Sequence, residues 1–169
     1  MRRLLSVLLV SGCLLAGLPQ VTPAQGTRGF TIFGGPDQEL DFYLQNGEAN
    51  EKDRYYLRIS KDKLRSSVVK LKIEYPDYYK GKFDTDKVKI NVGEEKVEVP
   101  VKSVTWNEEE RFITIEPEEA LSPDKKIELV LENVKNPWRG GMFYFNCRIV
   151  PLRGSSQPLY IGTWVLSIN

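Results

Sequence analysis

Apolar residues recur at every second position through most of this chain, and that period of two limits the folds it can form. Val69, Leu71, Ile73 and Tyr75, for example, alternate with charged residues. Because successive side chains of a β-strand point to opposite faces, the pattern predicts half-buried strands. Strands are predicted in this way at 55–59, 69–75, 88–92, 97–106, 111–116, 127–132, 142–150 and 159–168, with weaker signals at 30–33 and 40–44.

Short turn-forming segments separate these strands. Gly93–Glu95 and Asn107–Glu110 each join two alternating runs, so both are predicted to be hairpin turns. No stretch keeps a helical period for three turns, and a single turn is the most we expect at 62–66 or 117–121. The mature chain is therefore predicted to be all-β.

One predicted strand, 97–106, is irregular. Its apolar parity changes between Val101 and Val104, which we interpret as a β-bulge, and Pro100 indicates a sheet edge. With it the chain has eight or nine short strands. Such a set predicts an immunoglobulin-like antiparallel β-sandwich, because the apolar face of one sheet needs a second sheet to cover it; a β-barrel is the alternative.

The start of the chain has the pattern of a bacterial export signal. Arg2 and Arg3 precede a long apolar run, and small residues follow it up to Ala24. We expect residues 1–24 to be a signal peptide cut between Ala24 and Gln25, and 25–169 to form a single exported β-sandwich domain.

The two cysteines bear on processing and stability. Val10–Cys13 resembles a lipobox, so the alternative to cleavage after Ala24 is lipidation at Cys13. Cleavage after Ala24 would leave Cys147 alone, without a partner for an internal disulfide. Cys147 alternates with apolar residues and is predicted to be a small buried hydrophobe.

Charge and composition exclude several function classes. Removal of Arg2 and Arg3 leaves 22 basic against 23 acidic residues, a balance that gives no field to attract nucleic acid or an anionic bilayer. After the signal no apolar run is long enough to span a membrane. The chain contains no histidine, which excludes histidine-dependent nucleophiles and imidazole metal sites. It also lacks a glycine-rich phosphate loop, so no catalytic residue, metal site or cofactor is predicted.

Two groups of carboxylates are candidates for a chemical role. Glu108, Glu109 and Glu110 could supply an acid–base pair, but three adjacent acids at a hairpin tip favour a solvated turn. Asp84 and Asp86 could offer oxygen ligands to calcium, but the spacing falls short of a complete site and favours a capping or solvated loop.

Aromatic residues in predicted loops are the better candidates for binding. Tyr75, Tyr78 and Tyr79 fall within one segment, and Trp138 lies beside Arg139 in another. Tyrosine and tryptophan present large ring areas at low entropy cost to sugars or proteins. The candidate binding surface is therefore formed by these five residues; the alternative is that the rings fold back as caps over the core.

Three segments of the second half carry a resemblance. They are 134–137 (VKNP), 140–145 (GGMFYF) and 160–162 (YIG) with its apolar closing strand. In this order they resemble a family of exported cyanobacterial proteins known only as a domain of unknown function, over Phe30–Ile168. The resemblance implies a location in the cell envelope (periplasm) or thylakoid lumen. It assigns no activity to the chain.

These observations favour a non-enzymatic interaction module outside the cytoplasm, which binds an envelope protein through its loop aromatics or an exposed sheet edge. The alternatives are an envelope glycan-binding module that uses the same loop aromatics, and a carboxylate-dependent hydrolase.

Overall fold

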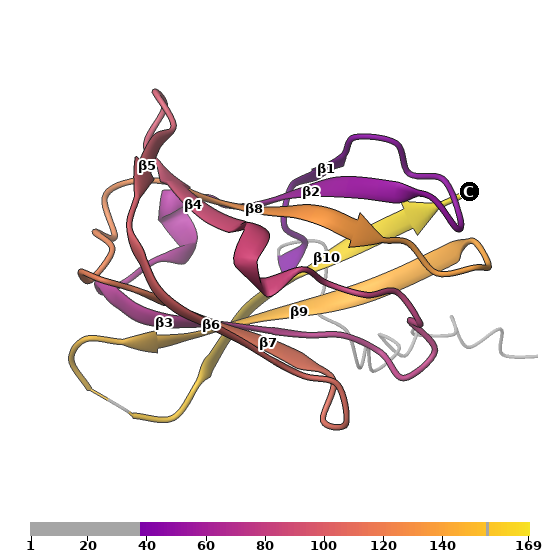
Figure 1. Ribbon diagram of the computed structural model, residues 1–169. Coiled ribbons are helices and arrows are strands. Elements are labelled where there is room, and N and C mark those ends of the chain that lie inside the picture. The colour runs from indigo at the N-terminus through magenta and orange to yellow at the C-terminus, as the bar shows by residue number, and fades with distance from the viewer. Residues whose placement is uncertain (1–37, 155) are drawn as a thin grey trace, which may run out of the picture. The chain divides into compact units, whose positions relative to one another are not determined.

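The computed structural model describes residues 38–154 and 156–169, which lie in one compact unit, and contains ten strands in two sheets (Figure 1). The first sheet is antiparallel throughout. Its strands, in spatial order, are β1 (Phe42–Leu44), β2 (Lys52–Ile59), β8 (Ile127–Lys135), β4 (Val88–Val92) and β5 (Val97–Val99).

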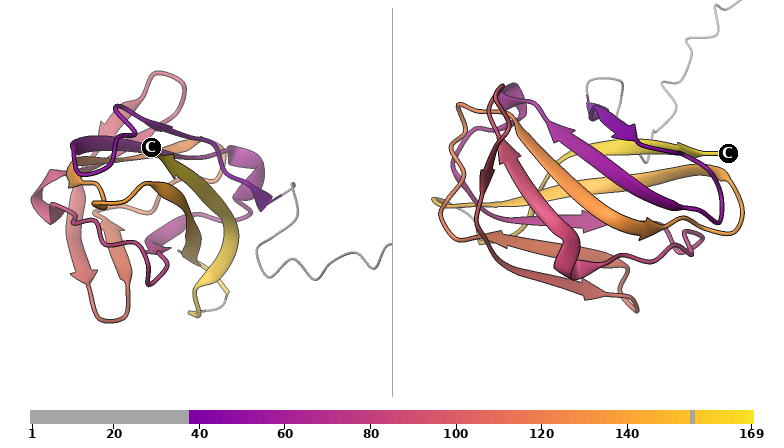
Figure 2. Two further views of the ribbon diagram at one scale, coloured as in Figure 1. Left: turned by 90° about the vertical axis from the view of Figure 1, so that its right-hand side faces the viewer. Right: turned by 45° about the horizontal axis from the view of Figure 1, so that its top comes forward.

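The second sheet is also antiparallel and packs against the first (Figure 2). Its strands, in spatial order, are β10 (Leu159–Ile168), β9 (Gly141–Pro151), β3 (Val68–Glu74), β7 (Phe112–Pro117) and β6 (Val101–Asn107). Two short 3-10 turns complete the fold, η2 (Lys61–Lys63) and η3 (Thr85–Lys87).

The connectivity is that of an immunoglobulin-like sandwich. The order β1-β2-β8-β4 corresponds to the A-B-E-D sheet of that fold, and β10-β9-β3 to its G-F-C sheet. Strands β5, β6 and β7 are inserted between the fourth and fifth strands of the pattern and widen both sheets. The predicted fold class is thus confirmed, with ten strands where eight or nine were expected.

The period-two pattern fills the space between the sheets as predicted, with one correction. Leu71, Ile73 and the free Cys147 are fully buried. On β3, however, Val68 rather than Val69 points into the core, because the register with β9 shifts between Val68 and Lys70.

The single strand predicted at 97–106 is wrong. The chain crosses from one sheet to the other at Pro100, so that β5 pairs with β4 while β6 pairs with β7. The register shift between Val101 and Ser103 confirms the predicted β-bulge and accounts for the change in apolar parity. The edge position that Pro100 indicated is also confirmed, because β5 and β6 are the edge strands of their sheets.

The turn predictions are confirmed in part. Hairpins join β4 to β5 and β6 to β7 at Gly93–Glu95 and Asn107–Glu110. Near 62–66 the structure has η2, whereas 117–121 holds no helical turn and η3 was not predicted.

The segment before β1 closes one side of the sandwich. Glu39 bridges Thr163 in parallel, and the amide of Leu40 donates to the carbonyl of Thr163 at 2.9 Å. A Cβ at Gly162 would lie 2.6 Å from the carbonyl oxygen of Gln38, so only glycine allows this approach.

Several sequence predictions lie outside the described residues: the strand at 30–33, the cleavage site at Ala24 and Gln25, and Cys13. Within the described ranges no helix has the length and apolarity needed to cross a membrane.

Candidate binding surface at the loop end

The two loops predicted to carry binding aromatics lie at the same end of the sandwich, which faces the viewer in Figure 2 (left). Lys82 and Lys135 exchange two backbone hydrogen bonds of 2.9 and 2.8 Å, which join the segment after β3 to the end of β8. The amide of Asn50 donates to the carbonyl of Pro137 at 2.8 Å, which adds the β1–β2 loop. We call this the loop end.

A buried polar network holds these loops together from beneath. The Tyr55 hydroxyl donates to Asn136 Oδ1 at 2.5 Å and lies 3.0 Å from the Tyr79 hydroxyl. Asn136 Nδ2 in turn donates to the carbonyl of Glu48 at 2.8 Å and to Asp53 Oδ2 at 3.1 Å. The network therefore links three segments distant in sequence: 48–55, Tyr79 and Asn136.

The network also sets the conformation of the β1–β2 loop and the charge state of its phenols. Asp53 is buried and accepts backbone hydrogen bonds from Asn46 and Gly47 at 2.9 and 2.8 Å. Burial raises the pKa of Tyr55 and Tyr79 well above the usual tyrosine value. Both hydroxyls therefore stay protonated at neutral pH and available as donors.

Two of the predicted surface residues belong to the core instead. Tyr75 and Tyr79 are only 7% and 3% exposed and pack with Phe83 and Phe145 in an aromatic cluster with ring centroids 4.9–6.2 Å apart. The Tyr75 hydroxyl accepts a 2.7 Å hydrogen bond from Trp106 Nε1, which satisfies its polar atom. Neither ring can be presented to a partner, and for these two residues the core-cap alternative holds.

The remaining predicted residues are exposed. Tyr78 is 52% exposed and stacks one face on the buried Phe143, with centroids 5.7 Å apart. Trp138 is 64% exposed, and the guanidinium of Arg139 lies 4.0 Å from the centre of its ring. The β8–β9 turn, which carries Trp138 and Arg139, lies against the end of β10, since a Cβ at Gly140 would meet the carbonyl oxygen of Ile168 at 2.5 Å.

Sequence reasoning missed Met142, which is 56% exposed on the outer face of β9 beside this turn. The signal was present, because Met142 precedes the inward-facing Phe143 and so falls on the outward parity of the strand. Tyr78, Trp138, Arg139 and Met142 together form what we call the loop-end surface.

The carboxylate candidates do not form a reactive centre. Glu108, Glu109 and Glu110 are exposed at the tip of the β6–β7 hairpin, where the amide of Glu110 donates to Asn107 Oδ1 at 2.9 Å. Asp84 accepts from the amide of Asp86 at 3.2 Å and caps η3, as the capping interpretation predicted. Among residues 38–154 and 156–169 no three His, Cys, Asp or Glu side chains are grouped to hold a metal ion.

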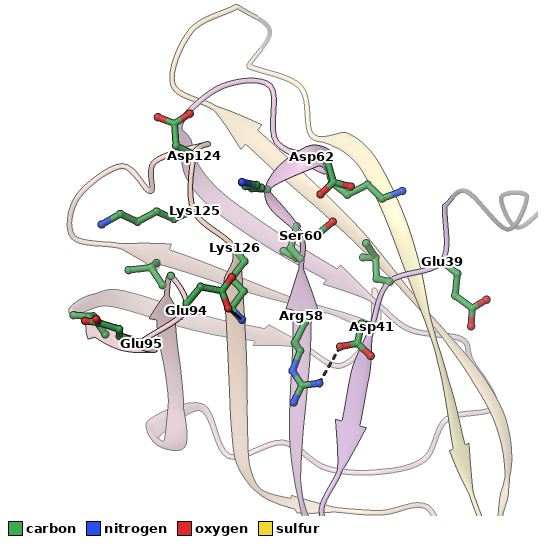
Figure 3. Close-up of a pocket in the computed structure, with 17 residues that line it drawn as sticks. Glu39, Asp41, Arg58, Ser60, Asp62, Glu94, Glu95, Asp124, Lys125 and Lys126 are labelled. Atoms are coloured by element: carbon green, nitrogen blue, oxygen red, sulfur yellow. Dashed lines mark hydrogen bonds and ion pairs between the residues drawn. The ribbon is translucent and has the colours of Figure 1, made fainter.

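A groove of about 840 Å³ opens at the opposite end, between η2, the β4–β5 hairpin and the start of β8 (Figure 3). Two of its charged pairs are in contact: Arg58 Nη1 lies 2.9 Å from Asp41 Oδ2, and Lys126 Nζ lies 2.5 Å from Glu94 Oε2. None of the predicted binding aromatics lines it.

Comparison with solved structures returns surface proteins and an uncharacterised protein at low similarity. The collagen-binding domain of a Staphylococcus aureus adhesin is 11% identical, with 76% of this chain and 95% of that chain covered and a TM-score of 0.44. The 35 kDa C-terminal fragment of the major pilin GBS80 of Streptococcus agalactiae is 9% identical, with coverages of 77% and 55% and a TM-score of 0.49. An uncharacterised Nocardia farcinica protein with an immunoglobulin-like fold is 9% identical, with coverages of 77% and 97% and a TM-score of 0.42. At TM-scores below 0.5 these similarities carry no information on function.

Comparison with curated proteins returns no match. The model of a family described as a protein of unknown function, DUF2808, matches residues 30–168. That span includes both sheets, the buried network around Asn136 and the loop-end surface. The chain therefore belongs to the DUF2808 family.

Proposed function

We propose that this protein is an exported, non-enzymatic binding module that contacts a partner protein through its loop-end surface. The composition of that surface supports the proposal. Trp, Tyr, Arg and Met are the residue types enriched at protein interfaces, and the first three dominate interface energetics. The loop-end surface contains one of each: Trp138, Tyr78, Arg139 and Met142.

The observation that carries the proposal is the exposure of Trp138. A large apolar ring left in water at the tip of a turn contributes little to the fold, since it is 64% exposed. The guanidinium of Arg139 lies 4.0 Å from the centre of the Trp138 ring, so the two side chains present an aromatic and a cationic group together. Such a pair is a typical interface anchor.

Rigidity beneath the surface adds a second argument. The amide of Asn136 fixes the first residue of the turn that presents Trp138, and Phe143 supports the ring of Tyr78. A partner would therefore meet side chains whose loops are already ordered, which lowers the entropy cost of association.

The test is binding with matched variants. A partner is first captured from envelope and lumen extracts, and its Kd is then measured for the wild type, Trp138→Ala and Leu152→Ala. Leu152 is a matched control because it is 55% exposed and follows β9 at the opposite end of the sandwich. We expect Trp138→Ala to weaken binding at least about 30-fold, the effect of losing a 2 kcal/mol anchor, and Leu152→Ala to change it less than about twofold. Equal affinities for all three proteins would refute the proposal.

The proposed location rests on the sequence and has its own test. An export signal cut after Ala24 would yield a secreted or periplasmic protein, or one in the thylakoid lumen, that begins at Gln25. Intact mass spectrometry of the protein from its native host distinguishes this product from one acylated at Cys13. A full-length unprocessed mass would contradict export.

A glycan partner is the second candidate function. With Tyr75 and Tyr79 in the core, only Tyr78 and Trp138 of the predicted rings could stack on a sugar. Tyr78 also borders a groove of mixed polar and apolar lining on the outer face of the second sheet. That groove, rather than the β8–β9 turn, is the feature that favours a sugar.

A further inference from the structure

The groove lies beside the loop end, on the outer face of the second sheet, and is bordered by β3, β9 and the segment that follows β3. Its volume is about 360 Å³, within the range of small-ligand sites. Polar and aromatic side chains from three segments line it: Glu74, Asp77, Tyr78, Arg111, Tyr144 and Asn146. Of these six residues, only Tyr78 was a site candidate from the sequence.

The polar groups on the floor are held in fixed positions by neighbouring strands. Glu74 Oε1 lies 3.1 Å from Lys72 Nζ, and its Oε2 accepts from Arg148 Nε at 2.8 Å. Asn146 Oδ1 accepts from Thr163 Oγ1 at 2.7 Å, a bond that does not use the Nδ2 hydrogens of the amide. A ligand would therefore meet preorganised acceptors and donors.

Tyr78 supplies a ring at the rim of the groove. One face of Tyr78 is stacked on Phe143 and supported by it, and half of the side chain is exposed. The electron-rich face of such a ring attracts the weakly positive C–H groups of a sugar. Tyr144 adds a second phenol to the lining.

The charge of the groove argues against an ionic ligand. Among its lining residues, Glu74 and Asp77 are acidic and Arg111 is basic, and Glu74 is already paired with Lys72 and Arg148. An anion would meet the carboxylates of Glu74 and Asp77, and a cation would meet the guanidinium of Arg111. A neutral ligand whose groups both donate and accept fits this mixture, because carboxylates only accept, guanidinium only donates and an amide does both.

We propose that this groove binds a neutral sugar unit of a glycan. The sugar ring stacks on Tyr78, and its hydroxyls bond to Asn146, Glu74 and Arg111. The site is distinct from the contact proposed for Trp138 and Met142, and it shares only Tyr78 with the loop-end surface. It does not depend on the protein-binding proposal.

The test is a titration of the ¹⁵N-labelled protein with three neutral probes: cellotetraose, maltotetraose and the tetramer of N-acetylglucosamine. At least one probe is expected to shift the amide resonances of Tyr78, Tyr144 and Asn146 in a saturable way. Asn146→Ala should raise the Kd of that probe about tenfold, the effect of one lost hydrogen bond. Tyr144→Ala, as a separate single variant, should raise the Kd by more. Unchanged resonances of the buried strands would show that each variant remains folded.

Trp138→Ala is the control that separates the two proposals. It should leave sugar binding unchanged and weaken the protein partner. Sugar binding lost with Trp138→Ala but retained with Asn146→Ala would overturn the groove proposal. Shifts with none of the three probes at roughly ten times a millimolar Kd would also overturn it, whatever the protein-binding result.

Discussion

Replacement of Asn136 by alanine tests the network that orders the loop end. The side chain is buried and makes three hydrogen bonds: one from the Tyr55 hydroxyl, one to the carbonyl of Glu48, and one to the carboxylate of Asp53. The two neutral bonds are worth about 1 kcal/mol each and the bond to the carboxylate about 2 kcal/mol. Tyr55 and Asp53 keep other partners, Tyr79 and the amide of Gly47, so part of this loss is recovered. We expect a net destabilisation of about 3 kcal/mol.

The assay is urea unfolding followed by tryptophan fluorescence. With a slope of about 2 kcal/mol per molar urea, the midpoint of Asn136→Ala should fall by about 1.5 M with an unchanged slope. Tyr55→Phe removes one of the same bonds, so the two substitutions should not be additive. Their double-mutant cycle should give a coupling of about 1 kcal/mol.

Two results would refute the reasoning. One is a loss of less than about 1 kcal/mol for Asn136→Ala, which would mean that water replaces the amide without cost. The other is strict additivity with Tyr55→Phe, which would mean that the 2.5 Å contact contributes nothing to stability.

Three further predictions concern the rest of the sandwich. Burial opposes ionisation of Glu128, but hydrogen bonds from two basic side chains and an asparagine outweigh it and lower its pKa. The stabilisation by ionised Glu128 is therefore present above the unfolded pKa of about 4.3 and lost as pH falls through the folded pKa. Urea midpoints measured from pH 7 to 3 should fall in the wild type and fall less in Glu128→Gln. An equal fall of the midpoint in both proteins would contradict this prediction. Burial raises the pKa of the Cys147 thiol, so a thiol reagent should react with it only after denaturation, and rapid labelling of the folded protein would count against this packing. Gly162→Ala places a Cβ 2.6 Å from the Gln38 carbonyl oxygen and should cost about 2 kcal/mol in urea unfolding; an unchanged midpoint would show that the segment before β1 can move away.

The sequence was sufficient for the local structure and for much of the core. Alternation along 142–150 placed Phe143, Phe145 and Cys147 inside, and they are buried. A period of two, however, says which residues share a face and not which sheet a strand joins. Pro100 marks a sheet edge as predicted, but its sequence context did not show that the chain changes sheets there.

The candidate site was predicted in part for a similar reason. Tyr75, Tyr78 and Tyr79 look equivalent in the sequence, and only the path of the loop decides which ring turns inward. The amide of Tyr79 bonds back to the carbonyl of Pro76 at 3.1 Å, and that turn directs Tyr79 into the core and leaves Tyr78 outside. The groove around Asn146 could not be predicted at all, because its residues meet only through the pairing of β3 with β9.

The segments that carry the family resemblance have structural roles. Asn136 directly follows β8 and is the centre of the buried network. Gly140 and Gly162 lie where backbone approaches too closely for any Cβ. These residues position the exposed side chains without forming the surface themselves.

Site-specific photo-crosslinking in the native host tests the central claim, that the loop end is a partner contact, most directly. A benzophenone amino acid is placed at position 138 in one variant and at the matched exposed position 152 in the other. The account predicts a discrete protein adduct from the crosslinker at position 138 and none from the crosslinker at position 152. The same adducts from both positions, or an adduct from Leu152 alone, would contradict it.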